Sequence, residues 1–332
     1  MNKSHKILVT GAAGFIGSHL VDRLLQEGHQ VVGLDNLFNG KLNNLEEANK
    51  DLNFLFIEGD ILNRKDVKKA MKGIEIVYHL ACLGVRHSLH SPFENHRVNA
   101  EGTHIVLEEA TNHNIDRFFY ISTSEIYGKT NSFPIKETDP TCPITIYGSS
   151  KLAGEHYTNS FNQCYGLNTT VLRIFNNYGP RAHYEGDSGE IIPRTIVNIL
   201  YNQNPIIFGD GLITRDFFFV KDTAKILTSL LGETKLNGHT INIGTGIEIT
   251  MKNLLDTILK LMPENKSKIK YLESRPADVP RLWVDNGKLN LMIKLSPFKN
   301  FESGLIETIN YYKELSNEAN LLDEISLLNW KK

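Results

Sequence analysis

The sequence predicts an α/β fold, a doubly wound parallel sheet followed by a smaller C-terminal α/β part. Two observations lead to this fold class. Short apolar runs alternate with amphipathic segments along the first half of the 332 residues, and such alternation is typical of a parallel sheet with helices on both faces. A glycine-rich turn also follows the first apolar run directly, which is typical of a helix that begins at the edge of such a sheet.

The expected strands are short and apolar, and the segments between them carry apolar residues at helical spacing. The strands are residues 6–10 (KILVT), 30–34 (QVVGL), 53–58 (NFLFIE), 76–80 (IVYHL), 117–122 (RFFYIS) and 240–245 (TINIGT). The helices are residues 14–28, 64–72 and 95–113, with another that begins near Tyr147. We expect residues 1–175 to form one domain, with later returns near 212–246, and residues 176–332 to form most of a second.

The composition is that of an ordinary globular protein. Hydrophobic residues make up 41% and charged residues 22%, and the formal net charge is −2, so the basic stripe of nucleic-acid binders is not found. The three cysteines have no CxxC spacing, and no apolar run approaches the length of a membrane span. His87, His90 and His96 lack a carboxylate companion at ligand spacing. We therefore expect a cytoplasmic protein with no nucleic acid, membrane or metal partner.

The turn after the first strand has the composition of a diphosphate site. The segment TGAAGFIG (residues 10–17) joins a strand to a helix N-terminus, where free N–H groups and the helix dipole face an anion. Because Gly11 and Gly14 lack side chains, the backbone can turn sharply and a diphosphate can approach it. The cofactor contacts expected here come from one run of residues: Gly11, Gly14, Phe15, Ile16 and Gly17.

Asp35 stands at the end of the second strand, where a dinucleotide-binding fold places the carboxylate that binds the adenosine ribose. This carboxylate repels a 2′-phosphate, and Asn36 rather than an arginine follows it, so the sequence favours NAD over NADP. After the third strand, Asp60, with Ile61 beside it, could reach the adenine edge or cap the next helix. The fourth strand ends in residues at the edge where a ligand crosses an open sheet: Leu80 and Ala81.

Hydroxyl groups and one carboxylate follow the fifth strand, in the segment STSEIYG (residues 122–128). The next helix carries Tyr147 and Lys151, and side chains four residues apart lie on one face of a helix. We expect the ammonium to favour the phenolate and to lower the pKa of Tyr147 toward the working pH. The candidate catalytic residues are Thr123, Ser124, Glu125, Tyr147 and Lys151.

With these motifs in this order, the sequence resembles the extended short-chain dehydrogenase/reductase family, specifically its NAD-dependent nucleotide-sugar epimerases, dehydratases and decarboxylases. The resemblance covers nearly the whole chain. It is also carried by GD at 59–60, HLA at 79–81, VN at 98–99, GT at 102–103, RIFNNYGPR at 173–181, FGDG at 208–211, TRDF at 214–217 and RPADV at 275–279. The family implies a Rossmann-type NAD-binding domain, a second domain that closes over a nucleotide sugar, and a homodimer built by the helices at 95–113 and 147–165.

By this resemblance, Tyr147 removes the proton from the sugar C4 hydroxyl, Thr123 hydrogen-bonds the reacting oxygen, and Lys151 holds the nicotinamide ribose. Tightly held NAD takes a hydride from C4 and returns it within one turnover. Asn99 is implied to belong to the cofactor site. The residues implied to bind the nucleotide diphosphate are Asn176, Arg215 and Arg275 at the phosphates, Phe208 near the base and Asp278 at a ribose.

Ser124 and Glu125 bear on which reaction takes place. A simple 4-epimerase needs only the hydroxyl, the tyrosine and the lysine, whereas in the resembling dehydratases this glutamate removes the C5 proton once C4 is a ketone. Thr-Ser-Glu also occurs in nucleotide-glucuronate decarboxylases, and Ser124 stands where dTDP-glucose dehydratases have aspartate. Glu125 therefore favours a 4,6-dehydratase, with a UDP-sugar (hexose or uronate) 4-epimerase and then a UDP-glucuronate decarboxylase as alternatives.

The opposite indication comes from the segment GVRHS (residues 84–88), which resembles the GVRxS segment of some uronate 4-epimerases. Arg86 and Ser88 could meet a substrate carboxylate or phosphate, and Arg181 could do the same. A non-catalytic NAD sensor is a different class, but such proteins typically lose the tyrosine–lysine pair that is present here. The sequence thus predicts an enzyme and favours a 4,6-dehydratase, but it does not settle the choice among the three reactions.

Overall fold

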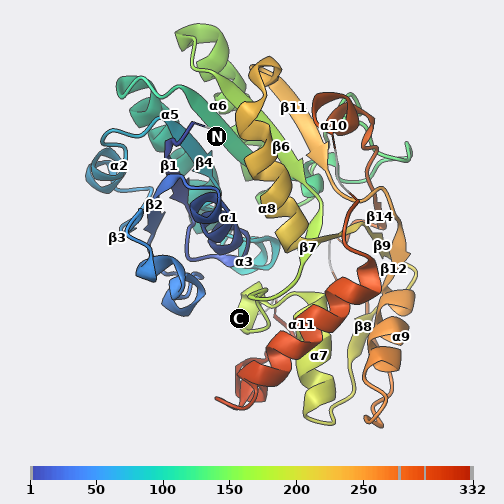
Figure 1. The fold of residues 1–332 in the computed structure, drawn as a ribbon. Coiled ribbons are helices and arrows are strands. Elements are labelled where there is room, and N and C mark those ends of the chain that lie inside the picture. Colours follow the sequence, from blue (N-terminus) through green and yellow to red (C-terminus); the bar gives the residue numbers. More distant parts are fainter. Residues whose placement is uncertain (1–2, 276–277, 295–296, 330–332) are drawn as a thin grey trace.

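The structure is a computed structural model that describes residues 3–275, 278–294 and 297–329. Its central sheet has seven strands in the order β11-β6-β5-β4-β1-β2-β3, and every neighbouring pair is parallel (Figure 1). The strands are β1 (Lys6–Thr10), β2 (Gln30–Asp35), β3 (Phe54–Glu58), β4 (Ile76–His79), β5 (Arg117–Thr123), β6 (Thr169–Ile174) and β11 (His239–Ile243). The predicted doubly wound parallel fold is confirmed.

The order of the strands creates a switch point between β1 and β4. The chain runs from β1 outward through β2 to β3, and then crosses to the other side of β1 to form β4, β5 and β6. In open α/β sheets, ligands bind at the carboxyl ends of the strands where this reversal occurs. The glycine-rich turn after β1 lies at this edge.

Helices cover both faces of the sheet (Figure 1). On one face α1 packs against α8, with Leu20, Leu24 and Leu227 fully buried between them and the sheet. On the other face α5 packs against α2 and α6, with Val106 and Leu107 fully buried. Their bounds are α1 (Phe15–Gln26), α2 (Arg64–Ala70), α5 (Thr103–Asn112), α6 (Ile146–Tyr165) and α8 (Val220–Ser229).

The helix expected over residues 95–113 consists of consecutive helical pieces. These are α4 (Pro92–His96), a π-helical turn (Arg97–Gly102) and α5. Within the wide turn, the Asn99 side chain accepts a hydrogen bond from the Leu83 N–H at 2.8 Å and donates one to the Leu83 carbonyl at 2.9 Å. The turn therefore fixes the loop that leaves β4 at the switch point.

The C-terminal elements form a smaller part with its own core, which contains the buried side chains of Ile196, Leu255 and Leu305. Its helices are α7 (Ile191–Leu200), α9 (Met251–Leu261) and α11 (Phe301–Leu315). Its short strands are β7 (Asn176–Tyr178), β8 (Ile206–Phe208), β9 (Thr214–Arg215), β10 (Phe217–Phe219), β12 (Ile249–Thr250), β13 (Lys270–Leu272) and β14 (Arg281–Leu282). The short helices α3 (Val85–His90) and α10 (Gly287–Met292) complete the fold.

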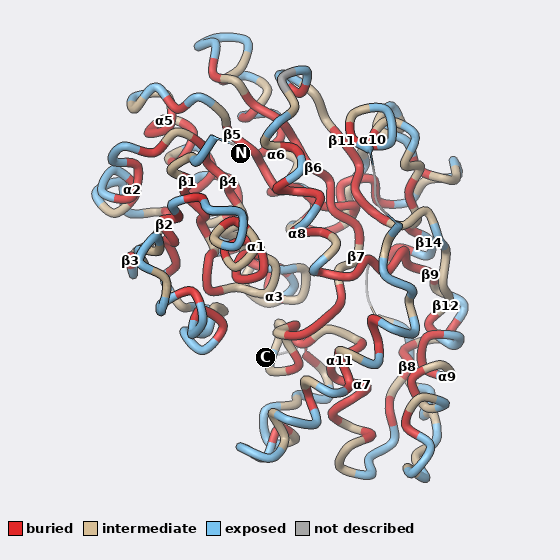
Figure 2. Tube along the Cα trace, viewed as in Figure 1, coloured by how far each residue is buried: buried red, intermediate tan, exposed pale blue. Residues whose placement is uncertain are grey.

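Burial follows this division into layers. Figure 2 shows buried segments along the central strands and along the inner sides of the helices, with exposed segments on the outer loops. Residues 220–243 return from the smaller part to the main sheet and supply α8 and β11. Among the helices that the structure describes, none is both long enough and apolar enough to cross a membrane.

Candidate active site

A cavity of about 560 Å³ opens at the carboxyl ends of the central strands, between the sheet and the smaller part. This volume is in the range of pockets that hold small molecules and cofactors. The structure brings most of the predicted site residues together in its lining. They are Gly11, Gly14, Phe15, Ile16, Gly17, Asp35, Asn36, Asp60, Ile61, Leu80, Ala81, Arg86, Thr123, Ser124, Glu125, Tyr147, Lys151, Asn176, Phe208, Arg215, Arg275 and Asp278.

The turn between β1 and α1 requires glycine for steric reasons. Gly11 has a φ of +71°, and a Cβ at this residue would lie 2.8 Å from the backbone nitrogen of Ala81. A Cβ on Gly17 would collide with the carbonyl oxygen of Gly11. The neighbouring backbone segments leave no room for side chains at these two glycines. The N-terminus of α1 therefore borders the cavity without side chains in the way, as a bound diphosphate requires.

The Asp35 carboxylate is held in place at the end of β2. It accepts hydrogen bonds from the backbone N–H groups of Ala13 at 2.9 Å and Leu37 at 2.8 Å, while burial raises its pKa. Beside it, the Asn36 amide donates to the Asp60 carboxylate at 3.0 Å. An open helix N-terminus next to a fixed carboxylate fits the diphosphate and adenosine ribose of a dinucleotide.

Thr123 and Tyr147 meet across the cavity wall. Thr123 ends β5, and its hydroxyl accepts a hydrogen bond from the Glu125 N–H at 3.2 Å. Tyr147 lies in the first turn of α6, where the Thr145 side chain caps the helix by accepting from the Gly148 N–H at 3.0 Å. The Tyr147 phenol is hydrogen-bonded to the Thr123 side chain, so both hydroxyl groups point to one place.

The expected lowering of the Tyr147 pKa is wrong for this structure. Burial raises the pKa of the phenol well above its usual value, and the charges of Cys82 and Glu125 raise it further. The Lys151 ammonium donates to the Ile121 carbonyl at 2.6 Å and lies 4.4 Å from the centre of the Tyr120 ring. Burial in turn lowers the pKa of Lys151. The spacing of Tyr147 and Lys151 predicts that they share a helix face. It does not predict their burial, which is the largest cause of both pKa shifts.

Glu125 lies in the same part of the cavity, in a short 3₁₀ turn (Ser124–Tyr127) after β5. Burial raises the pKa of its carboxyl group, and the charges of Arg215 and Arg86 partly oppose this shift. Ser124, which precedes it, is 3% exposed. Thr123, Glu125 and Tyr147 thus line one part of the cavity, the reaction chamber. The carboxyl group of Glu125 has an increased affinity for a proton there.

Arginines from the smaller part face the other end of the cavity. Arg215 is fixed by donating to the carbonyls of Val279 at 2.7 Å and Thr214 at 2.8 Å, and it lies 3.7 Å from Asp278. The Arg275 guanidinium lies 4.7 Å from the centre of the Phe208 ring and 4.0 Å from Asp278. Pro276 and Ala277 of the RPADV motif lie outside the described residues.

The Asn176 side chain also lines the cavity. Its oxygen is buried and has no hydrogen-bond partner among the described residues. Guanidinium groups, a side-chain amide and an aromatic ring are suited to a nucleotide diphosphate.

Three predicted residues are not part of the cavity lining. Asn99 is buried and braces the loop after β4. The Ser88 hydroxyl donates to the Val85 carbonyl at 2.6 Å inside α3. Arg181 pairs with Asp22 of α1 at 2.7 Å.

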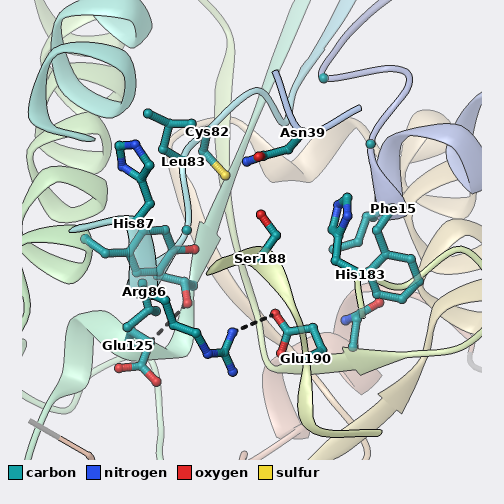
Figure 3. Close-up of a pocket in the computed structure, with 18 of the residues that line it drawn as sticks. Phe15, Asn39, Cys82, Leu83, Arg86, His87, Glu125, His183, Ser188 and Glu190 are labelled. Carbon is teal, nitrogen blue, oxygen red and sulfur yellow. Dashed lines mark hydrogen bonds and ion pairs between the residues drawn. The ribbon is translucent and has the colours of Figure 1, made fainter. Parts of the chain in front are cut away.

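The cavity also contains residues that were not predicted from the sequence (Figure 3). Glu190, just before α7, lies 3.7 Å from Arg86. Asp187 also lines the cavity, and its Oδ2 atom lies 2.7 Å from Nε2 of His90 in α3. Cys82 lies in the loop after β4 and lines the cavity. The polar composition of residues 179–193 was the one feature of the sequence that could have indicated Glu190 and Asp187 as site residues. Their contacts could not be predicted, because their partners on α3 are about a hundred residues away in sequence.

Comparison with known proteins agrees with this geometry. The family model described as "NAD dependent epimerase/dehydratase family" matches residues 7–244. The chain belongs to this family. It is therefore an enzyme that uses NAD, and the open turn after β1 and the fixed Asp35 carboxylate fit that cofactor. The predicted membership of the extended short-chain dehydrogenase/reductases is confirmed.

Relatives within the family differ in the reaction they are described with. A putative UDP-glucose 4-epimerase of Methanocaldococcus jannaschii is 36% identical over 92% of this chain and 98% of its own length. A dTDP-glucose 4,6-dehydratase of Streptomyces niveus is 32% identical over 93% of both chains. A UDP-glucuronic acid 4-epimerase of Bacillus cereus, solved with UDP-glucuronic acid and NAD, is 33% identical with a TM-score of 0.88, covering 93% of this chain and 99% of its own. The chain is thus similar to epimerases and dehydratases alike.

Proposed function

We propose that this enzyme is a nucleotide-sugar 4,6-dehydratase that works through a 4-keto intermediate. The observation that carries the proposal is the position of Glu125, whose carboxyl group shares the reaction chamber with Thr123 and Tyr147. A 4-epimerase needs no third acid–base group, whereas a C5 proton can be removed only by a base near the sugar. The family and its NAD cofactor support the shared first step of both reactions.

We assign binding of the nucleotide diphosphate to residues of the smaller part of the molecule. Arg215 and Arg275 provide guanidinium groups for the diphosphate, and Asn176 provides its amide N–H donors. Phe208 is the surface for the base, and Asp278 the partner for the ribose. The sugar then extends toward Thr123 and Tyr147, where the nicotinamide end of the cofactor site lies.

The first step is oxidation at C4. Thr123 orients the C4 hydroxyl, and Tyr147 removes its proton as general base. When bound, NAD supplies the acceptor that takes the hydride from C4 and later returns it to the sugar. Because the Tyr147 pKa is raised by burial, ionisation of the phenol needs a positive charge nearby, and Lys151 is the cation that α6 places on the same helix face.

The second step is elimination between C5 and C6. The C4 ketone acidifies the C5 proton, which Glu125 takes as the C5–C6 double bond forms and the C6–O bond breaks. Glu125 can return this proton to the departing hydroxyl, which leaves as water. One group then handles both transfers, so the serine at position 124 does not have to act as an acid. A carboxyl group with a raised pKa suits such a two-way transfer.

The 4-epimerase remains the second candidate, because Ser124 replaces the aspartate of the resembling dehydratases and several relatives are described as epimerases. The protein is incubated with UDP-, dTDP-, GDP- and CDP-linked sugars, and the products are weighed by mass spectrometry. Loss of one water supports the dehydratase. An unchanged mass with inverted C4 identifies an epimerase, and loss of carbon dioxide a decarboxylase.

Substitution Glu125→Gln tests the assigned base. We expect the variant to oxidise C4, with reduced nicotinamide visible by absorbance, while loss of water slows by about 10²- to 10⁴-fold. Glu302→Gln removes an exposed carboxylate at the start of α11 and serves as the matched control. Unchanged dehydration in Glu125→Gln contradicts the role of Glu125.

We also propose a homodimer formed through α5 and α6. Large aromatic side chains on α6 reach the surface here, with Tyr157 37% and Tyr165 65% exposed. The rings of Tyr157 and Phe161 pack edge-on against His104 of α5. Exposed aromatic groups on a rigid helix pair are typical of a protein interface. Light scattering after size-exclusion chromatography tests the proposal, and a monomeric mass contradicts it.

A further inference from the structure

One ion pair crosses the sugar end of the cavity. Arg86 comes from the first turn of α3, and Glu190 directly precedes α7. The Nη1 atom of Arg86 lies 3.7 Å from Oε1 of Glu190, and the Arg86 side chain is 15% exposed (Figure 3). The pair thus joins the sheet side of the cavity to the smaller part, close to the point where the sugar is expected.

Glu190 is not isolated from the reaction chamber. Glu190 lines the same cavity as Glu125 and Tyr147, and its negative charge raises the pKa of both groups. The Ser88 hydroxyl, by contrast, is turned into α3 and donates to Val85. The groups of the GVRHS segment that resembled a carboxylate-binding site are therefore occupied within the protein.

Arg86 belongs to a cluster of arginines that also contains Arg194, Arg215 and Arg275. Burial, together with repulsion from neighbouring arginines, lowers the pKa values of Arg194 and Arg275 to about 10. Glu190 and Asp278 are the carboxylates that pair with this cluster. Glu125 also interacts electrostatically with Arg86 and Arg215, so Arg86 already has two carboxylate groups near it. A further anionic group on the substrate would add a third.

We infer that the Arg86–Glu190 pair selects nucleotide hexoses with a neutral C6 group and rejects nucleotide uronates. This inference rests on the proposed nucleotide-sugar substrate. A uronate carboxylate at C5 would approach Glu190 and Glu125, and like charges at short range in a partly desolvated site oppose binding. A hydroxymethyl group meets no such repulsion.

The test compares binding of the natural protein to a hexose and to its uronate. The glucose and glucuronate forms are used with whichever of the four nucleotides binds most tightly, and each dissociation constant is measured by titration. We expect the uronate to bind at least about tenfold more weakly, equivalent to about 1.4 kcal/mol. Equal or tighter binding of the uronate overturns the inference.

Substitution Glu190→Gln tests the agent of selection. Removing the negative charge should free Arg86 and abolish most of the difference between hexose and uronate. Glu185→Gln removes a charge from the same segment but pairs with His183 and Lys41, so the preference for hexose should persist. An unchanged preference in Glu190→Gln, in protein that retains NAD, shows that Glu190 does not select the sugar.

These outcomes are separate from those of the proposed reaction. If the enzyme were an epimerase, the hexose would still bind better than the uronate, but its product would keep the substrate's mass. If it were a dehydratase without this selection, water would be lost from the hexose while the uronate bound equally well. The mass of the product and the binding ratio therefore report on the two proposals independently.

Discussion

At the scale of single residues, the Tyr147 phenol is the group on which the first chemical step depends. Tyr147→Phe keeps the ring and removes only the oxygen that is hydrogen-bonded to Thr123. We expect turnover to fall by about 10²- to 10⁴-fold, the usual contribution of a positioned general base. Product formation by mass spectrometry measures the loss. Tyr271→Phe, an exposed tyrosine on β13 outside the cavity lining, is the control, and full turnover by Tyr147→Phe contradicts the assignment.

Residues in local motifs could be predicted from the sequence, and residues that depend on packing could not. Gly11, Asp35 and Tyr147 stand at fixed distances from a strand end or helix start, so their places follow from the order of the elements. The raised pKa of Tyr147 depends on desolvation, which no spacing encodes. Glu190 contacts Arg86 across the cavity, and a contact between distant segments leaves no local pattern.

At the scale of the elements, the contact between α6 and β5 holds Lys151 in place. Gly154 of α6 faces Tyr120 of β5, and a Cβ at this glycine would collide with the Tyr120 hydroxyl. The Lys151 ammonium packs against the Tyr120 ring, and the Tyr120 hydroxyl donates a hydrogen bond to the Lys151 carbonyl at 3.2 Å. The packing of α6 on β5 thus affects the active site through the Tyr120 side chain.

Gly154→Ala should therefore affect both stability and activity. Overpacking of this kind destabilises a fold by about 1–3 kcal/mol, and displacement of Tyr120 should also reduce turnover in the fraction that remains folded. Chemical denaturation and product assays measure the two effects. Gly232→Ala is the matched control, because a Cβ there has no neighbour within 4 Å. A Gly154→Ala protein as stable and active as the control contradicts this account.

The elements themselves were largely predictable because most strands of the sheet are short apolar runs, whereas β6, which begins with two threonines, was not predicted. The strands from β1 to β5 lie within a few residues of the predicted ranges. The π-helical turn within residues 95–113 was not predicted, since its wide geometry serves the contact between Asn99 and Leu83 rather than the apolar spacing. The short strands of the smaller part have two or three residues each, too few for a period to be recognised.

At the scale of the whole molecule, the cavity lies where the sheet meets the smaller part, and a buried histidine lies close to this junction. His19 of α1 is 6% exposed, and its Nε2 lies 3.0 Å from the Pro180 carbonyl oxygen. Burial, together with the charge of Arg181, lowers its pKa to about 3. His79, at the end of β4, is also buried, with a pKa lowered to about 3. Both rings are therefore neutral in the folded protein at neutral pH.

Stability should accordingly decrease as the pH falls. In the unfolded chain a histidine binds a proton below about pH 6.5, whereas the folded protein leaves His19 unprotonated down to about pH 3. Between these values the unfolded state holds one more proton at this site, so the free energy of unfolding drops by about 1.4 kcal/mol per pH unit. His19→Gln keeps a donor for the Pro180 carbonyl but does not titrate, so its stability should decline less steeply by this amount, with the slope due to His79 remaining. Urea denaturation between pH 7.5 and pH 5 measures both slopes, and parallel curves for the two proteins contradict a neutral, buried His19.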